Sequence, residues 1–280
     1  MSTTTSSKTT EAGNPRLNQL FDDLIGTLCV FIRKHHVTHE EFRQAVACLS
    51  EAGEKGEIPL LMDVFLEVTV DRVASEGRGG TATCIEGPFY VTGAPAMKSP
   101  CVLPHRANEP GEVLILSGSV RSTDGAALPG SVVDIWQADA QGAYSHFNIP
   151  QADAPFNLRA RVSTDDDGRF EVRTWVPASY EIPKAGPTGK LLAAMARHAW
   201  RPAHIHLRVT HENCETLTTQ IFLAGDPWID SDVVGAVKRS LVAGLEQHDD
   251  PAELRRLGLA RPYYALSYDL VLPRKMAKAA

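Results

Sequence analysis

Two histidines, His204 and His206, stand two positions apart in the segment WRPAHIHLRV, residues 200–209. The segment has the alternation of a β-strand, and residues i and i+2 of a strand project from the same face. The two imidazoles would therefore lie side by side, in an arrangement that can hold a metal ion. A hydrogen-bonded histidine pair without a metal is the alternative, and the pair alone does not decide between them.

The type of metal site depends on the other ligands. The chain has no H-E-x-x-H motif, and His248 and Asp250 lie in a polar stretch typical of a solvated turn. The five cysteines have no C-x-x-C spacing, which argues against a thiolate zinc site and a disulfide framework. Tyr144 and Tyr180 are conspicuous in turn-rich segments, QGAYS and PASYEIP. Taken alone, each is equally compatible with ordinary packing.

Composition limits the class of protein. The chain has 280 residues, of which 43% are hydrophobic and 22% charged, so it can fill a core. A net charge of −6 argues against a nucleic-acid partner, although it leaves room for a local basic patch. No apolar run is long enough to span a bilayer, and the first residues lack the apolar stretch of a secretory signal. We therefore expect a reduced, cytoplasmic protein.

The N-terminal third is predicted to be helical. Residues 1–15 resemble a disordered tail, and residues 16–105 are predicted to form a helical linker and dimerisation domain. Thr38 and Glu41 form a capping-box pattern that would open a second helix, and residues 60–73 are apolar nearly all round. A first helix is indicated by apolar residues at helical spacing: Leu17, Leu20, Phe21, Leu24, Leu28 and Phe31.

Residues 106–280 have the sequence pattern of a β-rich domain, with short predicted strands and frequent turns. Asp165–Gly168 (DDDG) is typical of a hairpin turn between two of these strands, and residues 231–245 favour a late helix. The predicted fold class is α+β, mainly β: a β-sandwich catalytic core preceded by helices. Strands are predicted at residues 131–138, 159–162, 170–175, 204–210, 217–222 and 264–272.

Several separated motifs, in order, resemble the intradiol ring-cleavage dioxygenases of the catechol 1,2-dioxygenase group. They are GPFY at 87–90, LPG at 128–130, DIWQ at 134–137, GAY at 142–144, YEIPKAGPTG at 180–189 and RPAHIH at 201–206. The resemblance covers nearly the whole chain after the tail. That family carries its iron ligands in the order Tyr, Tyr, His, His, and the spacings here, 36, 24 and 2 residues, fit it.

The resemblance implies one non-haem Fe(III) per subunit, held by Tyr144, Tyr180, His204 and His206. Phenolate is a hard anionic donor that suits a hard trivalent cation, and a bound cation promotes deprotonation of its own ligand. Two phenolates and a hydroxide would balance its three positive charges. By position, Tyr180 matches the ligand that leaves when the substrate binds, which gives it a general-base role. Arg201 and Gln220 match the other catalytic residues.

The reaction implied is cleavage of catechol by O2 to cis,cis-muconate in the degradation of aromatic compounds. Asp63 stands out because it is the one carboxylate among the wall residues that the resemblance assigns, and it would accept a hydrogen bond from a ring substituent or shape the space beside it. The other wall positions are Leu60, Val64, Ile85, Gly87, Pro88, Phe89, Ile182, Pro183, Arg201 and Val234.

Local resemblances divide over the substrate. Residues 61–66 (LMDVFL) look most like chlorocatechol enzymes, whereas Trp200 and residues 230–234 (DSDVV) look closer to hydroxyquinol enzymes. Small changes in a pocket wall shift binding by only about 1–3 kcal/mol, so catechol is retained as the parent substrate. The resemblance also implies a homodimer joined through the N-terminal helices, with phospholipid as a possible ligand there. A non-catalytic β-sandwich binding module is the competing class.

Overall fold

The computed structural model describes residues 13–147 and 154–275. The chain divides into two compact units, residues 1–51 and 52–280, which are described in turn. The predicted disordered tail, residues 1–15, lies mostly outside the described residues. No helix in the described ranges is long and apolar enough to cross a membrane.

The first unit is helical, as predicted. α1 (Pro15–His35) begins at Asn14, whose side chain accepts hydrogen bonds from the first backbone N–H groups of the helix. α2 (His39–Glu54) opens with the predicted capping box: Thr38 N donates to Glu41 Oε2 at 2.8 Å, and Glu41 N donates to Thr38 Oγ1 at 3.2 Å. The six apolar side chains that predicted α1 are 46–62% exposed in the single chain.

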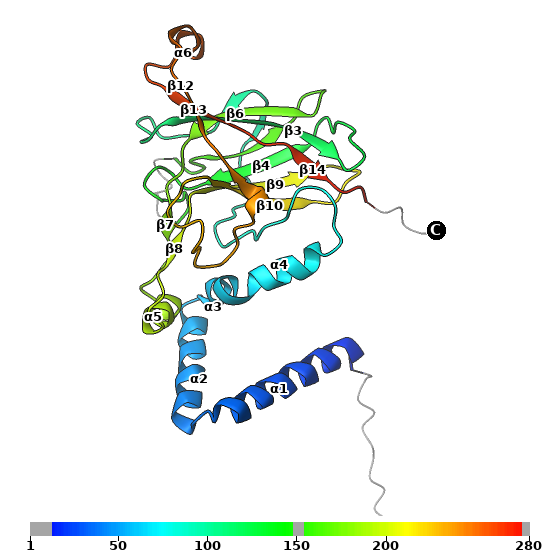
Figure 1. The fold of residues 1–280 in the computed structure, drawn as a ribbon, viewed down its shortest axis with the longest axis vertical. Helices are drawn as coiled ribbons and strands as arrows, with labels where there is room; N and C mark the ends of the chain where they lie inside the picture. The colour runs from blue at the N-terminus through cyan, green and yellow to red at the C-terminus, as the bar shows by residue number, and fades with distance from the viewer. Residues whose placement is uncertain (1–12, 148–153, 276–280) are drawn as a thin grey trace, which may run out of the picture. The chain divides into compact units, whose positions relative to one another are not determined.

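The second unit is a β-sandwich of two mixed sheets (Figure 1). Alternate residues of both sheets fill one apolar core, which explains the short alternating strands of the sequence. The first sheet has the order β1 (Ala96–Lys98), β5 (Arg159–Ser163), β4 (Val132–Gln137), β9 (His204–Thr210), β10 (Leu217–Leu223) and β11 (Val242–Ala243). The second has the order β12 (Glu246–His248), β13 (Tyr263–Ser267), β3 (Val113–Ser122), β6 (Arg169–Trp175) and β2 (Cys101–Val102), and β14 (Leu270–Leu272) also pairs with β3.

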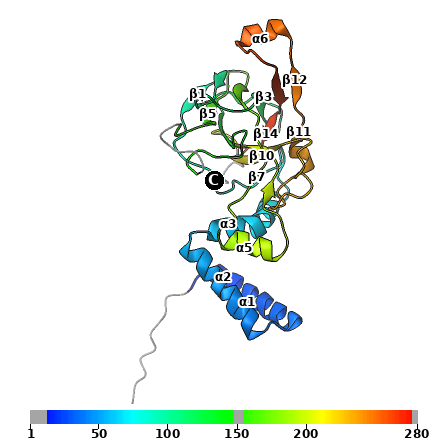
Figure 2. The ribbon, with the colours of Figure 1, turned by 90° about the vertical axis from the view of Figure 1, so that its left-hand side faces the viewer.

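Short helices and a two-stranded ribbon flank one side of the first sheet. α3 (Ile58–Met62), a π-helical turn (Asp63–Glu67) and α4 (Val68–Ser75) follow one another, and α5 (Pro187–Ala194) lies beside α3 in both views (Figure 2). The ribbon consists of β7 (Tyr180–Glu181) and β8 (Trp200–Arg201). A 3₁₀ turn (Arg239–Leu241) precedes β11, and α6 (Pro251–Leu257) lies between β12 and β13.

The predicted helix at residues 231–245 is wrong. This segment is an extended loop that ends in the 3₁₀ turn and β11. The backbone N–H groups of Val234 and Ala236, which a helix would use internally, donate instead to the carboxylate of Asp232 at 3.4 and 3.0 Å. Gly235 is in the left-handed region, with φ of 65°. A buried side chain has replaced the helical hydrogen-bond pattern.

Two strand predictions also need correction. The turn at Asp165–Gly168 forms, but its flanking strands do not pair as a hairpin, because β5 belongs to the first sheet and β6 to the second. Gly168 O accepts a hydrogen bond from Val120 N of β3, which draws the turn to the second sheet. The single strand predicted at 264–272 is divided into β13 and β14; between them, the side chain of the exposed Asp269 accepts hydrogen bonds from the N–H and the hydroxyl of Ser119.

Candidate metal centre

β9 places the two histidines at the centre of the first sheet. It pairs with β4 on one side and β10 on the other, so that His206 lies opposite both Trp136 and Gln220. His204 and His206 are each 1% exposed, and their Nε2 atoms lie 3.0 Å apart. Strand alternation has produced the paired imidazoles that the sequence predicted.

The two predicted tyrosines complete a closed circuit of rings with the histidines. Ring centroids are 5.4 Å apart for Tyr144 and Tyr180, 5.6 Å for Tyr180 and His204, 4.7 Å for the two histidines, and 6.2 Å for His206 and Tyr144. Tyr144 follows β4, and Tyr180 lies in β7. Gly142, with φ of 80°, permits this approach, because a Cβ there would lie 2.8 Å from the Cβ of Tyr180.

The ring nitrogens are prepared to accept a cation. His204 Nδ1 lies 2.6 Å from Pro202 O, which fixes the proton on Nδ1 and leaves a lone pair on Nε2. Burial, followed by the charge of Arg201, lowers the pKa of His204 to about 3. Burial also lowers the pKa of His206, with the neighbouring His204 adding to the effect. Both imidazoles are therefore neutral at physiological pH, the state that binds metals.

The phenols supply the anionic half of a donor set. Burial raises the pKa of Tyr144 and of Tyr180; the neighbouring Tyr180 adds to the shift at Tyr144, whereas the charge of Arg201 opposes it at Tyr180. A cation beside them would reverse that shift by stabilising the phenolates. The described residues contain no group of three or more His, Cys, Asp or Glu side chains suited to a metal, so only the tyrosines complete this site. Two imidazoles and two phenols fit a hard trivalent cation such as Fe(III).

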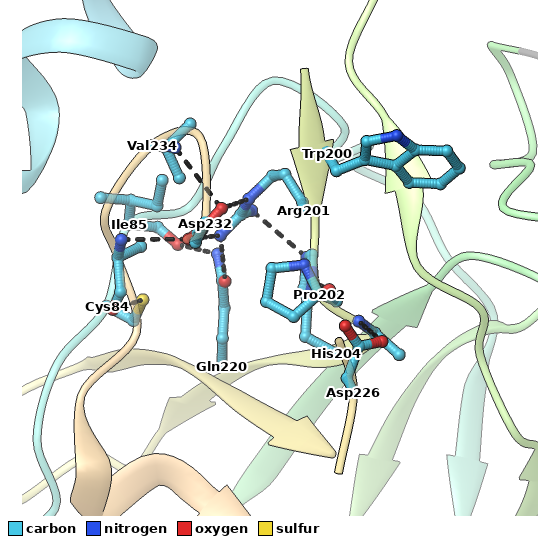
Figure 3. Close-up of polar contacts among 12 residues, drawn as sticks. Cys84, Ile85, Trp200, Arg201, Pro202, His204, Gln220, Asp226, Asp232 and Val234 are labelled. Carbon is cyan, nitrogen blue, oxygen red and sulfur yellow. Dashed lines mark hydrogen bonds and ion pairs between the residues drawn. The ribbon is translucent and has the colours of Figure 1, made fainter. Parts of the chain in front are cut away.

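One half of the circuit, here called the Tyr180 side, comprises Tyr180, His204, Arg201, Gln220 and Asp232. Figure 3 shows the last four of these. Arg201 Nε and Nη2 lie 3.1 and 3.2 Å from the two carboxylate oxygens of Asp232. The same guanidinium donates to Gln220 Oε1 at 3.0 Å and lies 3.3 Å from His204 Nε2. Burial opposes ionisation of Asp232, but Arg201 overrides it and holds the pKa of Asp232 below its usual value. Arg201 is thus a neutralised, tightly oriented cation.

The other half, the Tyr144 side, comprises Tyr144, His206, Trp136, Phe89 and Arg159. Trp136 stacks on His206 with centroids 4.6 Å apart and ring planes 12° apart. Phe89 stacks on Tyr144 at 4.6 Å and 22°. The Arg159 guanidinium lies 5.7 Å from the centroid of the Tyr144 ring. Tyr144 and His206 are therefore held mainly by aromatic packing. The Tyr180 side, in contrast, is held mainly by ionic contacts.

Most of the predicted wall residues gather around the rings. Gly87 lies beside His206, since a Cβ there would be 3.7 Å from His206 Cε1. Pro88 and Pro183 are exposed. Leu60, Val64, Ile85, Phe89, Ile182 and Val234 are buried in one apolar cluster with Tyr144 and Tyr180. A hollow of about 500 Å³ over the paired strands β3 and β6 is lined by none of these residues.

Asp63 is half-buried at the start of the π-helical turn. Burial raises its pKa, while a hydrogen bond from Glu67 and the charge of Arg201 oppose that change. Burial and the adjacent Asp63 raise the pKa of Glu67 to about 7. The two carboxyl groups therefore share a proton over part of the physiological range, and Asp63 can accept or donate a hydrogen bond.

Three residues around the circuit were not predicted as site residues: Asp232, Arg159 and Trp136. Asp232 was missed because residues 231–245 were predicted to form a helix, and because its partner Arg201 lies 31 residues away in the sequence. In the sequence, nothing distinguishes Arg159 from the other arginines in predicted strands. Trp136 could have been found from strand pairing, because β4 pairs with β9 and places it opposite His206.

Comparison with known proteins gives two family matches. Residues 14–81 match the family described as "Catechol dioxygenase N terminus", and residues 85–273 match the family described as "Dioxygenase". The chain is 42% identical over 247 residues to chlorocatechol 1,2-dioxygenase of Rhodococcus opacus, covering 87% of this chain and 95% of the relative. It is 36% identical over 271 residues to catechol 1,2-dioxygenase of Acinetobacter baylyi, covering 94% and 87%.

Solved structures have the same architecture. 3-Chlorocatechol 1,2-dioxygenase from Rhodococcus opacus superposes with a TM-score of 0.85 at 38% identity, covering 94% of this chain and all of the other. Hydroxyquinol 1,2-dioxygenase from Pseudomonas putida gives a TM-score of 0.82 at 33% identity, with 94% of each chain covered. The predicted fold class, N-terminal helices followed by a β-sandwich, is confirmed.

Proposed function

Since the chain belongs to the intradiol dioxygenase family of catechol and chlorocatechol 1,2-dioxygenases, we propose that it cleaves catechol to cis,cis-muconate with O2. Membership makes it an intradiol catechol-type 1,2-dioxygenase, and the family implies a non-haem Fe(III) centre. The observation that supports the proposed site is the closed circuit of Tyr144, Tyr180, His204 and His206 around two facing Nε2 atoms 3.0 Å apart. We assign these four residues as the ligands.

Bound Fe(III) would supply a Lewis-acid centre that draws electron density from a bound catecholate and activates its ring toward O2. Tyr180 and Tyr144 would hold it as phenolates, which offset two of its three positive charges, while the histidines stay neutral and a hydroxide would supply the third negative charge. Tyr180 is placed to act as general base, because its hydroxyl is near Arg201, which stabilises the phenolate form. We propose that the Tyr180 oxygen takes one catechol proton as substrate binds, and that the hydroxide of the charge balance would take the other.

Arg201 and Gln220 are proposed to act on the substrate ring. Arg201 presents a guanidinium that is fixed by Asp232 and Gln220, so it reaches negative charge developing on the ring without having to reorganise. Gln220 Nε2 donates to Ile85 O at 2.8 Å, which anchors the amide to the wall of the site. The apolar walls around the rings suit a flat aromatic diol.

The visible spectrum of the purified protein tests the site and the reaction together. A phenolate bound to Fe(III) has a charge-transfer band, so the protein should be red-brown with one iron per chain. Adding catechol without O2 should shift the band, and admitting O2 should release cis,cis-muconate. A protein that stays colourless after reconstitution with Fe(III) would refute the assignment and favour a non-catalytic binding module.

Chlorocatechol is the second candidate substrate, because the relative at 42% identity is a chlorocatechol enzyme. Hydroxyquinol is the third, since the half-buried Asp63 is a polar group among apolar walls and suits an extra ring hydroxyl. Comparing kcat/KM for catechol, 4-chlorocatechol and benzene-1,2,4-triol separates the three. A preference of tenfold or more for either alternative would overturn catechol as the preferred substrate.

We further propose a homodimer formed through the N-terminal helices, in the cytoplasm. The exposed apolar face of α1 is the support, since such a face is normally covered. Phospholipid is a proposed ligand of that region. Light scattering of wild type and of the variant Leu24→Glu tests the dimer, which the charge should weaken. Mass spectrometry of an organic extract of the pure protein tests the lipid, and an extract free of phospholipid would remove it.

A further inference from the structure

Arg159 is a buried cation whose hydrogen-bond partners are all neutral. It is 1% exposed, at the start of β5. Its Nη1 donates to Phe89 O at 2.7 Å, its Nε to Ser145 Oγ at 2.6 Å, and its Nη2 to Ser145 O at 3.1 Å. Within the described residues, no carboxylate forms an ion pair with this guanidinium.

A buried charge without a counter-charge is unfavourable, and two other arginines of the second unit have carboxylate partners. Arg201 is paired with Asp232, and Arg106 is paired with Glu109 and Asp139. Arg159 has no such carboxylate partner, because its three side-chain hydrogen bonds go to the oxygens of Ser145 and Phe89. The arrangement therefore lacks an anion at this position.

Tyr144 is the group best placed to be that anion. The guanidinium lies 5.7 Å from the centroid of its ring. Ser145, its neighbour in sequence, receives two of the three hydrogen bonds, and Phe89, which receives the third, stacks on the Tyr144 ring. Arg159 thus fixes the backbone next to Tyr144 and the Phe89 segment that packs on the Tyr144 ring. It also places a positive charge beside that ring.

We propose that Arg159 is a positioning residue that supplies the fixed counter-charge for Tyr144 in its phenolate form. The inference rests on the proposed function, in which Tyr144 is an iron ligand. It distinguishes the two tyrosines, because Arg201, whose charge Asp232 balances, acts on both of them, whereas Arg159 lies against the ring of Tyr144. Tyr144 would be the anion held throughout turnover, and Tyr180 the one free to leave.

The test is the visible spectrum of iron-loaded Arg159→Gln, with Arg159→Lys beside it. A positive charge near a phenolate lowers the energy of its donor electrons, so removing the charge should move the charge-transfer band to longer wavelength. Iron release to an excess of chelator at fixed pH should become at least tenfold faster. Arg159→Lys keeps the charge, and its band should lie near that of the wild type, with release within about threefold.

Arg173→Gln is the matched control. Arg173 is a half-buried strand arginine of the second sheet that also donates to a neutral acceptor, Leu257 O, at 2.6 Å. Its loss should leave both the band and the release rate unchanged. An unshifted band with wild-type iron release in Arg159→Gln would overturn the inference, whereas a colourless wild type would instead refute the proposed function. If Arg159→Gln does not fold, Arg159→Lys decides: a displaced band or rapid iron release in this variant overturns the inference.

Discussion

The two sides of the ring circuit each contain a buried arginine beside a tyrosine, but the two arginines differ in how their charge is balanced. On the Tyr180 side, Arg201 is paired with a carboxylate and its positive charge is balanced within 3.2 Å. On the Tyr144 side, Arg159 is equally buried but bonds only neutral oxygens. Two rings of the same chemical type therefore have different electrostatic surroundings, and we propose that Tyr144 is the permanent anion and Tyr180 the exchangeable one.

The comparison teaches that symmetry of ligand type need not mean symmetry of role. A tyrosine beside an unbalanced buried cation gains more from ionising than one beside a neutral ion pair. The histidines differ in a parallel way, because His206 is stacked on Trp136, whereas His204 is held by Pro202 O and lies near Arg201. Four experiments, taken from the largest expected effect to the smallest, test this difference.

Replacement of His206 by Ala should abolish iron binding and activity together. The substitution removes one of the two Nε2 atoms of the proposed ligand set, so neither side of the circuit would hold iron. Metal analysis and O2 uptake with catechol measure the two losses. His211→Ala, at the end of the same strand, should keep both, and a His206→Ala protein that retained one iron per chain would remove His206 from the ligand set.

The pair Tyr144→Phe and Tyr180→Phe should separate the two sides. We expect Tyr144→Phe to lose most of its iron, because Arg159 then has no anion to balance it. Tyr180→Phe should retain more iron but lose turnover by about 10²–10⁴-fold, the range for a missing general base. Iron content and kcat are the measurements, and equal iron loss in both variants would contradict the asymmetry.

Asp232→Asn should lower kcat/KM by about 10–100-fold while leaving iron in place. The amide can replace only one of the two oxygens that orient Arg201, and it leaves the cation unbalanced. The Tyr180 side would then resemble the Tyr144 side electrostatically. Steady-state kinetics and metal analysis measure the effect. Asp124→Asn, which breaks a surface pair with Arg274, is the control and should stay near wild-type kinetics.

The smallest effect is on acid stability of the metal-free protein. The native pKa of Asp232 lies below its unfolded value, so its ionised form stabilises the fold above the unfolded pKa, near 4. That contribution is lost as pH falls through the lower native pKa. The stability difference between wild type and Asp232→Asn, of order 1 kcal/mol, should therefore shrink below about pH 4. Urea unfolding of the wild type and of Asp232→Asn at several pH values measures this difference.

Sequence patterns predicted the parts of the molecule in which local periodicity and packing agree. The strand at 204–210 and the capping box at Thr38 are examples, because alternation and cap chemistry are properties of neighbouring residues. The family motifs predicted all four rings of the circuit, and the structure brings them together. Their role as ligands remains a prediction.

The predictions that were wrong, or that missed a residue, concern places where contacts between residues far apart in the sequence decide the structure. Residues 231–245 have helical periodicity, yet one buried carboxylate, bonded to an arginine 31 residues away, captures the N–H groups that a helix needs. Asp165–Gly168 forms its turn, but the choice between sheets is made by a contact with Val120. Asp232 and Arg159 escaped prediction for the same reason, since their importance comes from partners that the fold supplies.

The central position of β9 has a consequence for how the enzyme matures. Its two histidines stand between β4 and β10, and the tyrosines come from a loop and from a ribbon formed with Arg201. The four rings meet only after strands far apart in the sequence have paired, which is a late event in the folding of such a sheet. Iron would thus enter a chain that is already folded. The supply of iron in the cell would then set how many molecules are active, without setting how many are made or survive.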